Sequence, residues 1–220
     1  MAAAGRDPGA AGHGAAGADG ADGFRVPYAL ETLIDEVTMP PVLVQDGRAE
    51  EIEPMRPGGT VSYPEPVGEA EAIHTLHSEL RTFPESFGCR AASFRLSLEP
   101  ALLERLRALA SASREEVEAA GASVRRPLPS TVSVHLVEAD AGARTVRVSA
   151  VTRPMPEWGI GGGIVSAAPA AAAVRLLARG RLAAAGALPP ERCVAPEDLF
   201  PELERRACVF AVDTLERASA

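Results

Sequence analysis

The stretch VSVHLVEADAGARTVRVSAV, residues Val132–Val151, indicates two antiparallel strands that follow each other directly along the chain. Val132–Val137 and Thr145–Val151 are both rich in β-branched residues with polar residues between them, which is typical of half-buried strands. Small and turn-forming residues at Asp140–Ala143 separate the two runs. The sequence therefore predicts a β-hairpin here, and a hairpin belongs to antiparallel rather than parallel sheet.

Further helices and strands are predicted on both sides of this hairpin. The predicted helices are Tyr28–Met39, one that opens at Glu99-Pro100, Pro169–Arg179 followed by Gly180, and Pro196–Arg206. The predicted strands are Val42–Gln45 and Ala49–Ile52, joined as a short hairpin by the turn dipeptide Asp46-Gly47, together with Ala72–Leu76, Ala92–Leu98 and Cys208–Val212. Strands and helices do not alternate regularly. We therefore expect an α+β fold with a mixed, largely antiparallel sheet and helices on one face, rather than a complete doubly wound sheet.

Two segments between these elements are predicted to lack regular structure of their own. Pro57-Gly58-Gly59 is expected to form a turn, because proline and glycine favour turn conformations. Ser111–Arg126 is polar and low in complexity, and is expected to extend the preceding helix and then become a loop. The first 23 residues are nearly all Ala, Gly and Asp, so Met1–Gly23 is predicted to be a disordered tail before one domain over residues 24–220.

Composition excludes several classes of function. The net charge of −8 and the low aromatic content of 4% disfavour a nucleic-acid-binding protein. All 22 basic residues are arginine, so no lysine is present to form a Schiff base. The three cysteines are scattered and form neither a disulfide set nor metal-ligand spacing, which favours the cytoplasm. No apolar stretch is long enough to cross a membrane.

A dense group of polar residues ends the segment GTVSYPEPVGEAEAIHTLHSELRTFPESF, residues Gly59–Phe87. Two interpretations stay open for it. Ser78 could be the N-cap of a short helix with Glu79 in its first turn. Alternatively, His77, Ser78 and Thr82 could line a polar pocket for a carboxylate or an amine. Arg95, in the strand that follows, is either an ordinary exposed arginine or a carboxylate clamp.

Two other motifs are weaker than they first look. His74 and His77 are three residues apart in a predicted strand, where they would face opposite sides, so no metal site is expected. The glycine-rich run at Gly159–Gly163 lacks the third glycine position and the preceding strand of a dinucleotide-binding fingerprint. No lysine follows it, so it is not a phosphate-binding P-loop either. A mobile flap or a close approach of the backbone is the expected role.

Three longer segments resemble the second domain of saccharopine dehydrogenase-like oxidoreductases. They are YALETLIDEVTMPPVLVQDGRAEEIEP, YPEPVGEAEAIHTLHSELRTFPESF with CRAASFRLSL, and GIGGGIVSAAPAAAAVRLLARGRLAAAGALPPERCVAPEDLFPELERRA. Each is moderately specific alone, and their order and spacing make the match fairly specific. The resemblance runs from about Tyr28 to Val212.

The resemblance implies hydride transfer at the carbon–nitrogen bond of an amino-acid substrate, with NAD(P) held by a separate Rossmann domain. It implies that the part seen here binds the substrate and forms a homodimer. Substrate contacts would fall on His77, Ser78 and Thr82, with Arg95 as a further candidate and the Gly161, Gly162 and Gly163 loop closing over the substrate. No cofactor and no metal are expected to bind this chain alone, and neither nucleic acid nor membrane is an expected partner.

The chain also departs from the family pattern. A Rossmann half is absent from the sequence before Tyr28, and Ser166-Ala167-Ala168 stands where many relatives have Asp-Thr-Gly. At Arg206-Ala207-Cys208, Arg-Gly is usual. Three hypotheses follow: one half of a split dehydrogenase that works with a separate Rossmann chain, a truncated inactive relic, or a free-standing amino-acid-binding and dimerisation module.

Overall fold

The computed structural model describes residues 2–6, 25–124, 131–141, 144–158, 167–182 and 184–216. It divides the chain into two compact units, where the sequence was expected to form one domain. Unit 1 contains residues 1–6, 62–68 and 129–220, and unit 2 contains residues 7–61 and 69–128. Helices and antiparallel strands make up both units, so the predicted α+β fold class is confirmed.

Unit 1 is built on the predicted hairpin. Its strands lie in the order β10-β9-β8-β1, and the recorded neighbours are antiparallel. Strand β8 is Thr131–Ala141, β9 is Arg144–Thr152 and β10 is Cys208–Glu216. The prediction of the hairpin and of the last strand is confirmed, although all three strands are longer than expected. Residues 142–143 of the turn lie outside the described residues.

The amino terminus differs from the expected disordered tail. Ala2–Arg6 forms strand β1, which pairs antiparallel with β8 from Ala2 opposite His135 to Arg6 opposite Thr131. The physical reason is that strand pairing uses backbone N–H and C=O groups, so an Ala/Gly segment can complete a ladder without any apolar side chain to bury. The rest of the expected tail, residues 7–23, lies outside the described residues.

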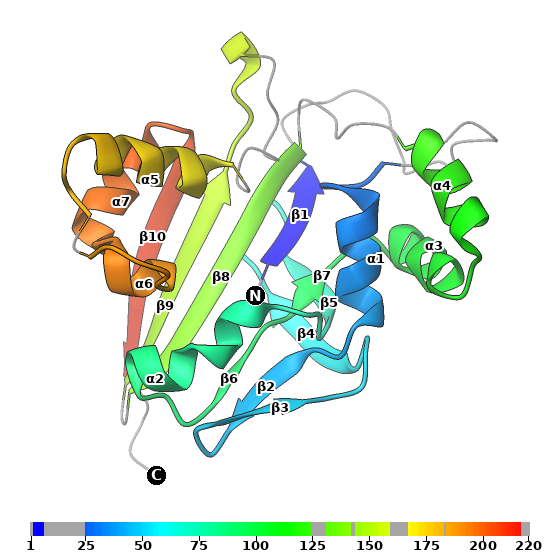
Figure 1. Cartoon of the computed structure of the whole chain (residues 1–220), viewed down its shortest axis with the longest axis horizontal. Coiled ribbons are helices and arrows are strands. Elements are labelled where there is room, and N and C mark those ends of the chain that lie inside the picture. Colours follow the sequence, from blue (N-terminus) through cyan, green and yellow to red (C-terminus); the bar gives the residue numbers. More distant parts are fainter. Residues whose placement is uncertain are drawn as a thin grey trace. The chain divides into compact units, whose positions relative to one another are not determined.

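Two helices cover one face of the β9 and β10 end of the unit 1 sheet (Figure 1). Helix α5 is Ala168–Ala178 and α7 is Pro196–Glu204, with the short α6, Pro190–Cys193, between them in the chain and η2, Pro156–Trp158, before α5. Buried alanines of α5 and Leu203 of α7 pack with Cys208 and Phe210 of β10. Helix α5 ends as predicted, because Gly180 takes a φ of +66° that favours glycine.

Unit 2 begins with helix α1, Leu30–Thr38, and a tight hairpin. Leu30, Leu33 and Val37 are the buried face of α1, as their spacing predicts. Strands β2, Val42–Gln45, and β3, Arg48–Glu51, pair around Asp46 and Gly47, whose φ angles are +49° and +77°. Two successive positive φ angles define the turn that matches strand twist, so the predicted Asp-Gly hairpin is confirmed.

The other strands of unit 2 correct two predictions. Pro57–Ser62 forms strand β4, not a turn. It lies at one end of the order β7-β5-β4, and proline is tolerated at the start of such an edge strand. The predicted strand Ala92–Leu98 is two short strands, β6 (Ala92–Ser93) and β7 (Leu96–Ser97), which pair with β2 and with β5 (Glu69–Ile73) respectively. Alternation alone cannot show that a strand changes partner.

Helices complete unit 2. Helix α3, Pro100–Ala110, opens with proline in its first turn as predicted, and a separate helix α4, Arg114–Ala122, replaces the expected extension and loop. Ser113 and Glu116 form a reciprocal capping box that starts α4 afresh. The short helices η1, Ser78–Arg81, and α2, Phe83–Phe87, follow β5. Among the described residues, none of the helices has both the length and the hydropathy needed to span a bilayer.

The main core of unit 2 joins α1 to α3. Leu33 and Leu106 are completely buried, and Val26, Leu30, Val37 and Ile73 pack with them. A smaller cluster of Val42, Val44 and Leu80 holds η1 against β2. These two clusters position the chain that leaves β5 and enters η1, which is the segment predicted to contain the site.

Candidate functional site

The predicted site lies in unit 2, where the chain leaves β5 beside the carboxyl end of α1. The backbone N–H of Leu76 donates to the carbonyl of Glu36 at 3.2 Å. Thr75 on one side is completely buried, and His77 on the other stacks on Phe94 with ring centroids 3.4 Å apart and an interplanar angle of 15°. These contacts hold both polar side chains in place before η1 begins.

Two polar atoms of this segment, Thr75 Oγ1 and His77 Nδ1, are buried without a well-formed hydrogen bond to any described residue. The backbone of Thr75 and Leu76 lies close enough to the His77 ring to raise its pKa slightly against burial, so Thr75 Oγ1 is the clearer case. Buried polar atoms in folded proteins nearly always have a partner, from the protein, from water or from a ligand. Leaving a hydroxyl unsatisfied costs about 1–3 kcal/mol. The pair therefore has the chemistry of a place that a polar ligand completes.

Electrostatics keep the imidazole uncharged. Burial lowers the pKa of His77, and it outweighs the opposing effect of the nearby Glu79 carboxylate. A neutral imidazole has one donor nitrogen and one acceptor nitrogen, so its Nδ1 can pair with either kind of group. At neutral pH the segment therefore adds no positive charge of its own at His77.

Acidic groups gather near the same end of α1. The Tyr28 hydroxyl donates to Glu36 Oε2 at 2.5 Å. Burial raises the pKa of Glu36, and the charge of Glu79 raises it further against the hydrogen bond from Tyr28. Burial and Glu36 together raise the pKa of Tyr28, so that hydroxyl stays protonated. The charge of Glu79 therefore raises the pKa of both Glu36 and His77.

The structure decides the role of Ser78 against the capping interpretation. Helix η1 has His77 at its N-cap position, and no side chain makes a capping hydrogen bond there. Ser78 is instead the first residue of η1 and is exposed. Thr82, at the other end of η1, uses its hydroxyl to donate to the carbonyl of Glu79 at 3.0 Å. Ser78 is therefore exposed, whereas Thr82 is half-buried like His77, with its hydroxyl bonded within η1.

Arg95 makes different contacts from His77. Its Nη1 donates to the carbonyl of Gly58 at 2.9 Å, and its Nε is buried without a partner among the described residues. Glycine at position 58 leaves room for this side chain, because a Cβ there would lie 2.8 Å from Arg95 Cδ. The side chain is half-buried, so the interpretation as an ordinary exposed arginine is wrong. After burial, the charge of Arg95 helps to lower the pKa of His74, whose Nδ1 pairs with the Phe94 carbonyl.

Sequence reasoning found His77 but not its acidic neighbours. Tyr28 and Glu36 are eight residues apart in the chain, on either side of the start of α1. This spacing does not predict a contact between their side chains. The Gly161, Gly162 and Gly163 loop, predicted to close over the substrate, lies outside the described residues.

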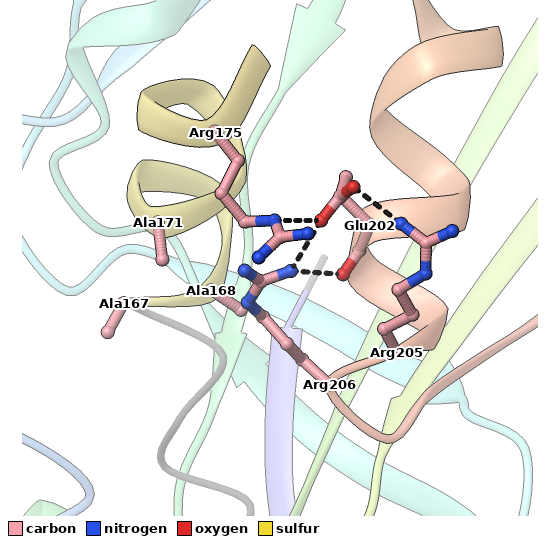
Figure 2. Close-up of a pocket in the computed structure, with 7 residues that line it drawn as sticks. All are labelled: Ala167, Ala168, Ala171, Arg175, Glu202, Arg205 and Arg206. Carbon is pink, nitrogen blue, oxygen red and sulfur yellow. Dashed lines mark hydrogen bonds and ion pairs between the residues drawn. The ribbon is translucent and has the colours of Figure 1, made fainter. Parts of the chain in front are cut away.

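A second cluster of charged residues lies in unit 1, and sequence reasoning missed it (Figure 2). The Glu202 carboxylate, 2% exposed, is contacted by four arginines. Arg175 lies in α5 and Arg179 directly follows it, 2.9 and 2.8 Å from the carboxylate, while Arg205 and Arg206 follow α7 and lie 2.6 and 3.2 Å away. Two spacings in the sequence could have indicated this cluster. Arg175 and Arg179 are four residues apart, and Arg205 and Arg206 follow Glu202 by three and four residues.

A cavity of about 370 Å³ opens beside this cluster. Its lining residues are Ala167, Ala168, Ala171, Arg175, Glu202, Arg205 and Arg206 (Figure 2). Burial acts to raise the pKa of Glu202, but the Arg206 hydrogen bond and the charges of Arg175, Arg205 and Arg179 outweigh it and hold the pKa below its ordinary value. Glu202 is therefore ionised at neutral pH.

Two features of the described residues bear on the expected cofactor and metal. The strand pairings recorded in both units are antiparallel, whereas the pyrophosphate cradle of a dinucleotide fold needs a parallel strand–helix–strand crossover. The described part of the chain holds no group of three His, Cys, Asp or Glu side chains that could bind a metal ion. Comparison with models of known families and with curated proteins finds no match.

Proposed function

We propose that this chain is the substrate-binding part of a cytoplasmic oxidoreductase of the saccharopine dehydrogenase-like kind, and that unit 2 binds an amino-acid-like ligand beside Thr75 and His77. The observation that carries the proposal is the buried Thr75 Oγ1, which has no hydrogen-bond partner among the described residues, beside His77 Nδ1, which makes no well-formed hydrogen bond there. Both belong to the polar segment that the sequence singled out. A ligand that hydrogen-bonds to them would remove the cost of leaving them unsatisfied.

The charges around this segment favour an amino group in the ligand. The charge of the Glu79 carboxylate raises the pKa of both His77 and Glu36, and burial keeps the His77 imidazole neutral. An ammonium group would therefore meet negative potential without a competing cation at His77. The Thr75 hydroxyl can both donate and accept, so it can pair with an amine or with a carboxylate.

Hydride transfer would require NAD(P), which a separate Rossmann chain would supply. This chain's residues would then bind and orient the amino-acid substrate, whose reacting carbon must lie within contact distance of the nicotinamide. In the alternative, the chain is a non-catalytic amino-acid-binding and dimerisation module, or a truncated inactive relic. Fluorescence titration with NADPH and NADH distinguishes them: a split enzyme binds the dinucleotide only together with a Rossmann partner.

We also propose that the chain forms a homodimer through the hairpin sheet of unit 1. Val137, Val148 and Val212 lie opposite one another across β8, β9 and β10. Val137 and Val212 are 57% and 63% exposed, so the row presents apolar surface that a second copy would cover. Light scattering on the purified chain tests this, and a monomer at all concentrations would remove it.

Isothermal titration of the full chain with a panel of L-amino acids tests the binding site itself. His77→Phe keeps a ring to stack on Phe94 but removes Nδ1, and Thr75→Val removes the hydroxyl while keeping the shape. We expect both to weaken binding by about tenfold or more, the value of one buried hydrogen bond to a charged ligand. Arg90→Ala, which breaks only an exposed ion pair with Asp46, should bind normally. Equal affinity in all four proteins would show that the ligand binds elsewhere.

A further inference from the structure

The arginine cluster of unit 1 contains more positive charge than its one carboxylate can balance. Four guanidinium groups surround Glu202, which leaves a net charge of +3 among these five side chains. A carboxylate offers about four lone-pair sites, while each guanidinium carries five N–H donors. Most of these N–H donors therefore cannot hydrogen-bond to Glu202. Four like charges held this close also repel one another, and an added anion would relieve that repulsion.

The ion pair of Asp198 in α7 with Arg181 does not change the net charge of the arginine cluster. Asp198 pairs with Arg181 at 2.6 Å, and its carboxylate contacts that guanidinium through both oxygens. Among the described residues, the ion pairs recorded for Arg175, Arg179, Arg205 and Arg206 all involve Glu202. No other recorded ion pair of the described residues balances this excess charge.

The cavity places this excess charge where a ligand can reach it. Arg175, Arg205 and Arg206 line the space of about 370 Å³, which is within the size range of small-molecule sites. Arg175 and Arg205 are 48% and 61% exposed, so their outer donors are accessible. Arg206 is only 14% exposed and is fixed by bonds to both the backbone carbonyl and the carboxylate of Glu202.

The first turn of α5 adds to the positive potential. Ala167, Ala168 and Ala171 form the rest of the lining, and the N-cap residue Ala167 supplies no side-chain cap. The first backbone N–H groups of a helix have no partner within the helix, and the helix dipole is positive at this end. Anions bind at such places, and here guanidinium groups from α5 and α7 stand beside the same cavity. The small methyl side chains leave the space open.

We propose that this cavity is a binding site for a phosphate group, held by Arg175, Arg205 and Arg206 and by the amino end of α5. Guanidinium forks match the oxygens of phosphate, and the doubly charged anion would neutralise most of the excess charge. The alanine side makes room for a small organic group attached to the phosphate. Glu202 holds the arginines in place and limits the affinity, because it is itself an anion that competes for their donors.

The test is titration calorimetry of the full chain with inorganic phosphate, at constant ionic strength maintained with sodium chloride. We expect saturable binding to the unaltered chain, and binding about tenfold or more weaker in Arg175→Ala and in Arg205→Ala, the loss expected for one charge-assisted contact. Arg114→Ala is the matched control, because that arginine is 91% exposed and its recorded ion pair is with Glu118 on α4 of unit 2. Circular dichroism checks that each variant is folded.

Two further arms make the proposal specific. Glu202→Gln removes the competing charge but keeps the shape, so it should bind phosphate more tightly than the unaltered chain, which a purely structural role for the cluster does not predict. Glycerol phosphate distinguishes the sources: tighter binding than phosphate identifies an organic phosphate, and equal binding identifies the free ion. No saturable binding of either compound, or equal binding by Arg175→Ala, Arg205→Ala and Arg114→Ala, would overturn the proposal. Thr75→Val should leave phosphate binding unchanged. The phosphate site and the proposed amino-acid site are therefore tested independently of each other.

Discussion

Replacing Thr75 by valine should stabilise the ligand-free chain and weaken its binding of the proposed amino-acid ligand. Thr75 is 0% exposed, and its Oγ1 has no hydrogen-bond partner among the described residues. Burying such a hydroxyl costs about 1–3 kcal/mol, and valine replaces it by a methyl group of nearly the same shape. We therefore expect the free energy of unfolding to rise by about 1–3 kcal/mol. For a chain of 220 residues each kcal/mol corresponds to roughly 2–4 °C in the melting temperature.

Urea denaturation followed by circular dichroism measures this change. The midpoint should move to higher urea without a change in slope, since the surface exposed on unfolding is the same. Thr152→Val is a matched control: Thr152 is 1% exposed, but its hydroxyl donates to Cys208 Sγ at 3.6 Å, so its replacement should bring no comparable gain. If Thr75→Val lowered the stability instead, the hydroxyl would have a partner in the ligand-free protein, and the argument for a site at Thr75 would fail.

Three further measurements test the fold of unit 2. Leu33→Ala should lower the free energy of unfolding by about 2–5 kcal/mol in urea denaturation, because Leu33 is completely buried and its loss leaves a cavity; a smaller change would mean that the core around it is loose. Burial lowers the pKa of His74 and of His77, so the unfolded chain takes up protons first and stability should fall as the pH drops below about 6.5; a double variant, His74→Asn with His77→Asn, should lose this part of the pH dependence. Ser113→Ala removes the acceptor for the Glu116 N–H and should cost about 1 kcal/mol, with helix loss visible by circular dichroism; an unchanged midpoint would show that α4 does not depend on its capping box.

Local signals in the sequence predicted much of the fold because they reflect short-range physics. The Asp46-Gly47 turn, the proline that opens α3 and the Gly180 that ends α5 each depend on the backbone preferences of single residues. The strand alternation of the β8–β9 hairpin depends only on which side of the sheet is buried. The α4 capping box, Ser113 with Glu116, was equally local, and its signal was overlooked within a polar stretch.

The predicted site was found in part, for the same reason. The polar segment around His77 stands out by composition, so its density of hydrogen-bonding groups could be recognised without a structure. Whether each side chain is buried could not be recognised. Ser78 and His77 are neighbours in the chain, yet Ser78 is exposed and His77 is stacked on Phe94, because η1 turns one outward while the segment after β5 holds the other inward.

The sequence by itself determined the α+β class, the main helices and hairpins, and the polar segment after β5, since these depend on residues close together in the chain. Only the tertiary structure decided which distant groups meet. The two halves of the arginine cluster, Arg175 and Arg205, are separated by a loop and by α6, and they meet at Glu202 because α5 and α7 pack side by side on one sheet. Tyr28, which precedes α1, meets Glu36 eight residues later. Contacts of this kind depend on packing between elements, which no local pattern of residues specifies.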